Sequence, residues 1–379
     1  SNSTFTEARS WFVANDPITF TDGASTAIAG TCSTFNNSDT SIGTNATSLT
    51  AQNHLLIASA QVSTFAAPSR TFNTGLFTGA TKISQGQFNL TSGTGTNNTH
   101  AMLLLGKLNA GAANTYDVRA CSSGGTLKGA ANVVAIAGMN YSGFVDGAST
   151  TISTTDTTLA TVTPTMPTGN NTIIASIALW NQGAAQQTIA AGNLKLKDAS
   201  GTVIASNPYI ITLAAGNVGT NTSTNQTAIL MAVVSNAAAN PTYSVTALLN
   251  NGAGGTPKGE AKILVVQSGK EYFSNGASTA IGVAQTGGTT IGTLNTSFAS
   301  GDTIVVIGVA ALNQTGVVQK IKERNLYIQQ GATNVTRSEF IVQTLNTGAN
   351  AGHGMFFPLV YTTTLTSANP IFTMKATTA

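Results

Sequence analysis

The chain has 379 residues, of which 8% are charged, and a formal net charge of +3. So weak a charge argues against nucleic-acid binding, because phosphate recognition needs clustered Lys and Arg. The longest apolar runs, such as residues 303–312, are too short to cross a bilayer, so no membrane span is expected. The start at Ser1 resembles a processed N-terminus, so we expect a secreted, extracellular protein whose leader has been removed.

The beginning of the chain is repeated inside it. Residues 6–26 align without a gap with residues 259–279, which places Glu7 on Glu260 and Arg9 on Lys262, and a third copy spans residues 132–150. Both internal copies follow a complete set of predicted strands, so each is expected to end one repeat and lead into the next. The sequence therefore predicts three repeats of about 125 residues. Their expected boundaries are 18–141, 142–271 and 272–379, after an N-terminal donor strand at 1–17.

Taken in order, each repeat consists of short predicted strands. The central segments, residues 55–60, 172–179 and 304–311, are apolar at nearly every position, which is typical of strands covered on both faces. Other segments alternate between apolar and polar residues, and Gly, Asn and Pro separate them. No segment has a sustained helical period. We expect an all-β chain of three tandem antiparallel β-sandwiches, Ig-like or jelly-roll-like, the last one completed by a donated N-terminal strand.

The two ends of the sequence do not match. Residues 369–379 align with residues 240–250, so the third repeat is expected to stop one strand early, whereas the first strand has no repeat before it. A sandwich without its last strand exposes core side chains and unpaired backbone groups, so another segment must fill the gap. The predicted donor strand contains Glu7, Ala8, Arg9, Trp11, Phe12 and Val13, and the predicted acceptor strand contains Ile371, Phe372, Thr373 and Met374.

The donor strand could come from the same molecule or from a neighbour. Donation within one chain requires three repeats to fold back into a closed ring, whereas donation between chains repeats a head-to-tail contact and generates an open filament. The sequence leaves both routes open. We expect the chain itself as the main partner in a head-to-tail homopolymer, with the cell surface or other filaments as further candidates.

Two residue types suggest covalent modification. The only cysteines, Cys32 and Cys121, both lie in the first repeat, and a disulfide between neighbouring strands is expected, with two buried thiols as the alternative. Twelve Asn-x-Ser/Thr triplets are slightly more than so polar a composition would produce by chance, and several are expected to carry N-glycans. The candidates are Asn2, Asn36, Asn45, Asn89, Asn97, Asn140, Asn170, Asn221, Asn225, Asn295, Asn313 and Asn334.

Catalytic groups are scarce. The chain has three histidines, His54, His100 and His353, and contains no nucleophile elbow or HExxH motif. Asp22-Gly and Asp146-Gly recur at matching positions and are expected to form turns rather than a calcium site. We therefore expect no enzyme, no cofactor and no metal site.

The leading strand EARSWFVA, the Thr/Asn/Gly/Ala-rich sandwiches and the many sequons resemble the donor-strand-complemented surface filaments of archaea. These are the thread filaments and the bundling pili related to bacterial TasA-type biofilm fibres. The resemblance implies a glycosylated extracellular filament that serves adhesion, cell contact or biofilm formation. Two other classes also fit the composition: a viral tail-fibre or capsid protein, and a monomeric surface adhesin or carbohydrate-binding protein.

Overall fold

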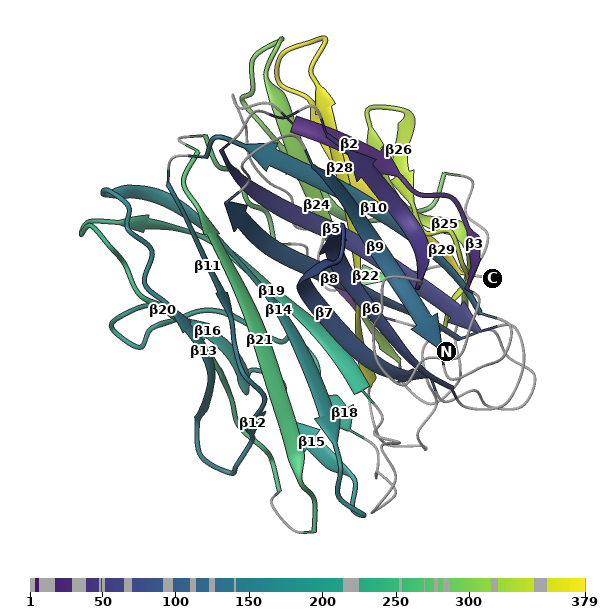
Figure 1. Ribbon diagram of the computed structural model, residues 1–379, viewed down its shortest axis with the longest axis vertical. Helices are drawn as coiled ribbons and strands as arrows, with labels where there is room; N and C mark the ends of the chain where they lie inside the picture. The colour runs from purple at the N-terminus through teal and green to yellow at the C-terminus, as the bar shows by residue number, and fades with distance from the viewer. Residues whose placement is uncertain are drawn as a thin grey trace.

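The structure is a computed structural model in which every assigned element is a strand in an antiparallel sheet, which confirms the all-β fold class. The strands fall into three sandwiches that follow one another along the chain (Figure 1). The residues that the structure describes are 4–6, 18–28, 39–47, 49, 52–64, 70–90, 98–109, 114–122, 127–139, 141–213, 225–251, 254–268, 270–275, 279–281, 287–314, 320–343 and 353–378.

The first sandwich has two sheets. The inner sheet has the order β2-β10-β5-β8, with β3 also paired to β10, and the outer sheet has the order β4-β9-β6-β7. The bounds are β2 (Ile18–Asp22), β3 (Thr26–Ile28), β4 (Thr40–Ala46), β5 (Asn53–Thr64), β6 (Arg70–Thr78), β7 (Thr81–Leu90), β8 (Asn98–Asn109), β9 (Thr115–Ser122) and β10 (Leu127–Ala137).

The second sandwich repeats this arrangement. Its inner sheet runs β11-β21-β14-β19, with β12 paired to β21, its outer sheet runs β13-β20-β16-β17, and β15 pairs with β18. The bounds are β11 (Ser142–Asp146), β12 (Thr150–Thr151), β13 (Thr157–Val162), β14 (Gly169–Asn181), β15 (Gln187–Ile189), β16 (Leu194–Lys197), β17 (Val203–Ser206), β18 (Ile211–Leu213), β19 (Asn225–Asn236), β20 (Tyr243–Ala247) and β21 (Pro257–Val266). Successive strands alternate between the two sheets in the manner of a jelly roll.

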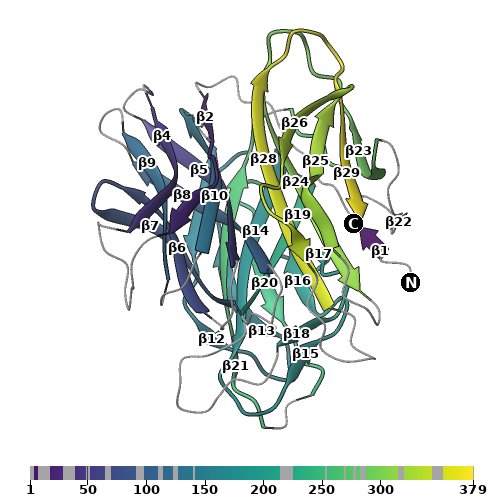
Figure 2. The same ribbon diagram turned by 90° about the vertical axis from the view of Figure 1, so that its right-hand side faces the viewer.

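The third sandwich contains a strand from the other end of the chain. Its inner sheet has the order β22-β1-β24-β28, and its outer sheet has the order β23-β29-β25-β26, with β27 paired to β25. In Figure 2, β1 lies among the strands of this sandwich, far along the sequence from its own neighbours. The bounds are β1 (Thr4–Thr6), β22 (Thr279–Ala280), β23 (Thr289–Asn295), β24 (Thr303–Gln314), β25 (Lys320–Gln330), β26 (Thr333–Arg337), β27 (Val342–Gln343), β28 (His353–Thr364) and β29 (Ile371–Thr378).

Equivalent turns reveal the repeat at atomic level. Asn240 and Asn369 both have a φ of 52° and both precede a proline. The backbone N–H of Asn240 donates to Met166 O at 2.9 Å, and that of Asn369 donates to Phe298 O at 2.8 Å. Asn tolerates the left-handed conformation better than most residues, which explains its use at both turns.

The three sandwiches surround a shared core. The fourth strands of the inner sheets, β8, β19 and β28, contact one another. One buried apolar cluster joins Leu103 of β8 and Ile229 of β19 to Val360 of β28, whereas the first and third sandwiches each keep a separate core as well. The sandwiches therefore form a closed ring with pseudo-threefold symmetry rather than a linear string (Figures 1 and 2).

Candidate functional site: the closing strand of the third sandwich

We call the strand that completes each inner sheet the closing strand. In the first two sandwiches it is β10 or β21, and it lies between the short opening strands and β5 or β14. In the third sandwich the same position, between β22 and β24, is taken by β1. The N-terminal segment of the chain therefore supplies the missing strand to its own third sandwich.

The strand that receives β1 is buried on both faces. Ile304, Val306 and Leu312 of β24 belong to the core of the third sandwich, while Val305 and Ile307 belong to the core shared by the ring. An empty position beside β24 would leave backbone N–H and C=O groups unpaired next to apolar side chains, which is costly. This requirement explains why the position is filled.

The register of β1 can be compared with that of the other closing strands. Thr26 pairs with Gly129, Thr150 pairs with Gly259, and the corresponding Thr279 pairs with Phe5. A Cβ atom on Gly129 would lie 2.7 Å from Ile42 Cγ2, and one on Gly259 would lie 2.9 Å from Leu159 Cδ1. The third sandwich thus has a phenylalanine where the other two need glycine to let the outer sheet approach.

A buried lysine marks the closing strand of the second sandwich. Lys262 is 5% exposed, and its Nζ donates to Asp146 Oδ1 at 2.6 Å and also contacts Glu260 Oε1. These pairs compensate a charge that would otherwise be costly to bury. In the alignment, Arg9 and Glu7 correspond to Lys262 and Glu260, so the N-terminal segment carries the same pair of charges.

The predicted donor residues Glu7, Ala8, Arg9, Trp11, Phe12 and Val13 lie outside the described residues. The predicted acceptor strand is wrong. Ile371, Phe372, Thr373 and Met374 belong to β29, which pairs with β23 and β25 in the outer sheet. Because consecutive jelly-roll strands alternate between sheets, the last strand of the sequence is not the neighbour of the strand that completes the sandwich.

Cys121 is buried on β9 and is disulfide-bonded, and Cys32, the other cysteine of the chain, lies outside the described residues.

The glycosylation candidates differ in exposure. Asn170, Asn295 and Asn334 are exposed. Asn45 does not fit a glycan, because it is 1% exposed and its Nδ2 donates to Val133 O at 2.9 Å. The remaining candidates, or their side chains, lie outside the described residues: Asn2, Asn36, Asn89, Asn97, Asn140, Asn221, Asn225 and Asn313.

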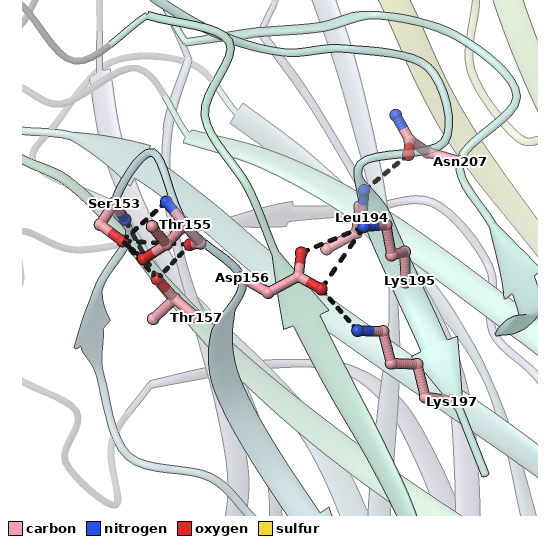
Figure 3. A network of polar contacts seen from close by, with 8 residues as sticks. All are labelled: Ser153, Thr155, Asp156, Thr157, Leu194, Lys195, Lys197 and Asn207. Atoms are coloured by element: carbon pink, nitrogen blue, oxygen red, sulfur yellow. Dashed lines mark hydrogen bonds and ion pairs between the residues drawn. The ribbon is translucent and has the colours of Figure 1, made fainter. Parts of the chain in front are cut away.

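The described part of the chain has a charge cluster on the outer sheet of the second sandwich. Asp156 accepts from Lys195 Nζ at 3.1 Å and from Lys197 Nζ at 2.5 Å, as Figure 3 shows. The hydrogen bond from Lys197 is the main reason that the pKa of Asp156 is lowered. Beside it, the hydroxyls of Ser153 and Thr157 lie 3.1 Å apart. The cluster fixes the loop before β13 to β16 and has no nucleophile or base poised for catalysis.

Within the described ranges, no group of three or more His, Cys, Asp or Glu side chains could hold a metal ion. The same residues include no helix that could span a membrane. His100 is buried at the start of β8, and burial lowers its pKa from 6.5 to about 4.

No model of a known protein family matches the sequence, and no curated protein matches it. Among solved structures, one of infectious bursal disease virus, Gx strain, is 12% identical, with a TM-score of 0.21 over 71% of this chain and 73% of that one. A protein of Parabacteroides distasonis ATCC 8503, classed by inference as secreted, is 10% identical, with a TM-score of 0.19 over 70% of this chain and all of that one. Likenesses this weak support no conclusion about function.

Proposed function

We propose that the chain is a structural protein of an extracellular or virion surface, built as a single-chain ring of three jelly-roll sandwiches. The observation that carries this proposal is the pairing of β1 with β22 and β24, which closes the third sandwich with a segment of the same chain. A ring closed in this way needs no second molecule to complete it. Jelly rolls are common in capsid and lectin domains, and this fold-level analogy is the reason for placing the protein on a surface.

The composition supports a passive structural role. Few charges and many Thr, Ser and Asn residues give a nearly neutral polar surface. The ion pairs of the described residues, such as Lys262 with Asp146 and Lys195 with Asp156, join neighbouring strands or fix loops to them. On this proposal the protein acts by presenting its loops and sheet surfaces to other components rather than by chemistry.

The test is the state of the purified full-length chain. Size-exclusion chromatography with light scattering should give a single species near the chain mass of 38.4 kDa, and negative-stain images should show compact three-lobed particles. Long fibres from the same preparation would contradict a self-closed ring.

A second candidate is a filament formed by donation of the N-terminal strand from one chain to the next. One observation favours it: the third sandwich is closed by a strand that does not follow β29 along the chain, so an equal strand from a neighbour could occupy the same position. Exchange of an identical element between protomers is a low-cost route to assembly, and a head-to-tail exchange that does not close makes a fibre. In this case the fibre would be extracellular and would serve adhesion, cell contact or biofilm formation, as in the archaeal filaments that the sequence resembles.

A further inference from the structure

Two of the three interfaces around the ring have the same polar contact. Ser59 Oγ of the first sandwich donates to Pro358 O of the third at 2.7 Å, and Ser176 Oγ of the second donates to Leu103 O of the first at 2.6 Å. Both serines lie on the strand next to the closing strand and point out of their own sandwich. Each contact therefore ties one sandwich to the one before it.

The third interface has a different residue at this position. Ser59 pairs with Asn132 and Ser176 pairs with Lys262, in each case three residues beyond the glycine of the closing strand. Phe5 takes the place of that glycine and pairs with Leu312, so the equivalent position on β24 is three residues before Leu312, at Val309. Val309 is buried in the shared core and has no hydrogen-bond donor in its side chain.

The interfaces that carry a serine have further polar contacts. Between the first and third sandwiches, Asn132 Nδ2 donates to Thr336 Oγ1 at 3.0 Å, and Glu339 N donates to Gln61 Oε1 at 2.9 Å. Between the second and first, Thr227 Oγ1 donates to Ala101 O at 3.0 Å. Directional bonds of this kind resist sliding and separation more than apolar contact alone does.

The closing strands also border the neighbouring sandwich. β10 contacts β28 of the third sandwich, and β21 contacts β8 of the first. By the same rotation around the ring, β1 belongs at the interface between the third and second sandwiches. That interface thus combines the apolar position Val309 with a closing strand that is not continuous with the rest of its sandwich.

We propose that the ring has one seam, between the second and third sandwiches, at which it opens, and that the N-terminal strand is the strap that holds this seam shut. This inference rests on the proposed closed ring. Release of the strap frees both the strand and its position on β24 at the same time. The seam is therefore the place at which a closed molecule can exchange strands with a second copy of the chain.

The test uses three single-cysteine variants of the full-length chain at equivalent positions: Ser59→Cys, Ser176→Cys and Val309→Cys. The described residues include no free cysteine, so the background of labelling is low. Under native conditions, iodoacetamide reaches a buried thiol in proportion to local opening. We expect Val309→Cys to react roughly tenfold faster than the other two, which corresponds to about 1.4 kcal/mol easier opening. The loss of a serine donor can only speed labelling in the two comparison variants, so the comparison is conservative.

A second change tests the strap. Trp11→Ala removes a large apolar side chain from the N-terminal segment and should raise the labelling rate of Val309→Cys severalfold, with those of Ser59→Cys and Ser176→Cys unchanged. Thermal melts of every variant establish that the chain is folded. Equal labelling rates at the three positions, or a uniform rise with Trp11→Ala, would overturn the seam. A fibrous wild-type protein would instead overturn the proposed function, and light scattering reports this separately.

Discussion

Phe5 pairs with Thr279 in the third sandwich at the position where Gly259 pairs with Thr150 in the second. The ungapped alignment of Glu7 with Glu260 places Thr6, not Phe5, on Gly259. A shift of one residue moves every side chain of a strand to the opposite face of the sheet. The register of β1 therefore decides which N-terminal side chains face the core of the third sandwich and which face the rest of the ring.

The pair Phe5→Cys with Thr279→Cys should form a disulfide. Directly opposed residues of antiparallel strands have Cα atoms about 4.5–5.5 Å apart, which is within the range that a disulfide spans. If the strand is donated within the chain, the bond is intramolecular and the oxidised protein stays a monomer on a non-reducing gel. If the strand is donated between chains, the same pair gives a ladder of covalent multimers.

The matched control is Thr6→Cys with Thr279→Cys. Thr6 is one residue out of phase, so its side chain lies on the other face and should cross-link poorly. Efficient cross-linking of the control and not of the Phe5 pair would mean that β1 follows the register of the sequence alignment instead.

Deletion of residues 1–15 should unfold the third sandwich and spare the other two. Trp11, Phe12 and Val13 would together contribute about 5–8 kcal/mol if buried, at about 1.5–3 kcal/mol each. This is comparable with the whole stability of a typical domain, about 5–15 kcal/mol. Calorimetry should show one transition lost or moved to lower temperature. Addition of a peptide with the sequence TFTEARSWFVAN should restore it, whereas a scrambled peptide should not. Unchanged melting of the deletion variant would show that the third sandwich does not depend on the segment.

The sequence predicts the strands better than their partners. The alternating and doubly apolar segments indicate an all-β chain because side-chain burial imposes those patterns locally. The acceptor strand is wrong because neighbours along the chain are not neighbours in a jelly-roll sheet, so Ile371 lies in the opposite sheet from Phe5. The contacts of the ring leave one sequence signal. Ser59 and Ser176 interrupt strands that are otherwise apolar, and a buried hydroxyl needs a partner. The sequence does not say that this partner is in another sandwich.

Glycosylation should follow exposure in the folded chain. In a host that adds N-glycans, Asn295 and Asn334 are expected to be modified, whereas Asn45 is expected to stay bare because Val133 O accepts from its amide inside the sandwich. Glycopeptide mapping with enzymatic release in heavy-oxygen water would locate each occupied site. Asn45→Ala should lower the free energy of unfolding by about 1–3 kcal/mol, the cost of leaving a buried acceptor unpaired. Asn295→Ala, at the exposed end of β23, is the control that should change stability little. A glycan on Asn45 of the folded protein would contradict the burial of its side chain.

Mild acid should destabilise the protein through His100. Burial lowers the pKa of His100 to about 4, compared with 6.5 in the unfolded chain. Above pH 6.5 neither state binds the proton, so His100 adds no pH dependence there. Between pH 6.5 and 4 the unfolded state binds a proton that the folded state does not, so the free energy of unfolding falls as the pH falls, by about 3 kcal/mol in total. Urea unfolding at pH 7 and pH 4.5 measures this loss. The matched variant is His100→Gln, because Gln226 occupies the equivalent position of the second sandwich, opposite Leu179 as His100 is opposite Val62. The pKa values of Asp156 and Asp302 are also lowered, by hydrogen bonds from Lys197 and from the backbone of Ala299, but their contributions are lost only below about pH 4. If the variant lost as much stability as the wild type between pH 7 and 4.5, the acid sensitivity would have to come from a group other than His100.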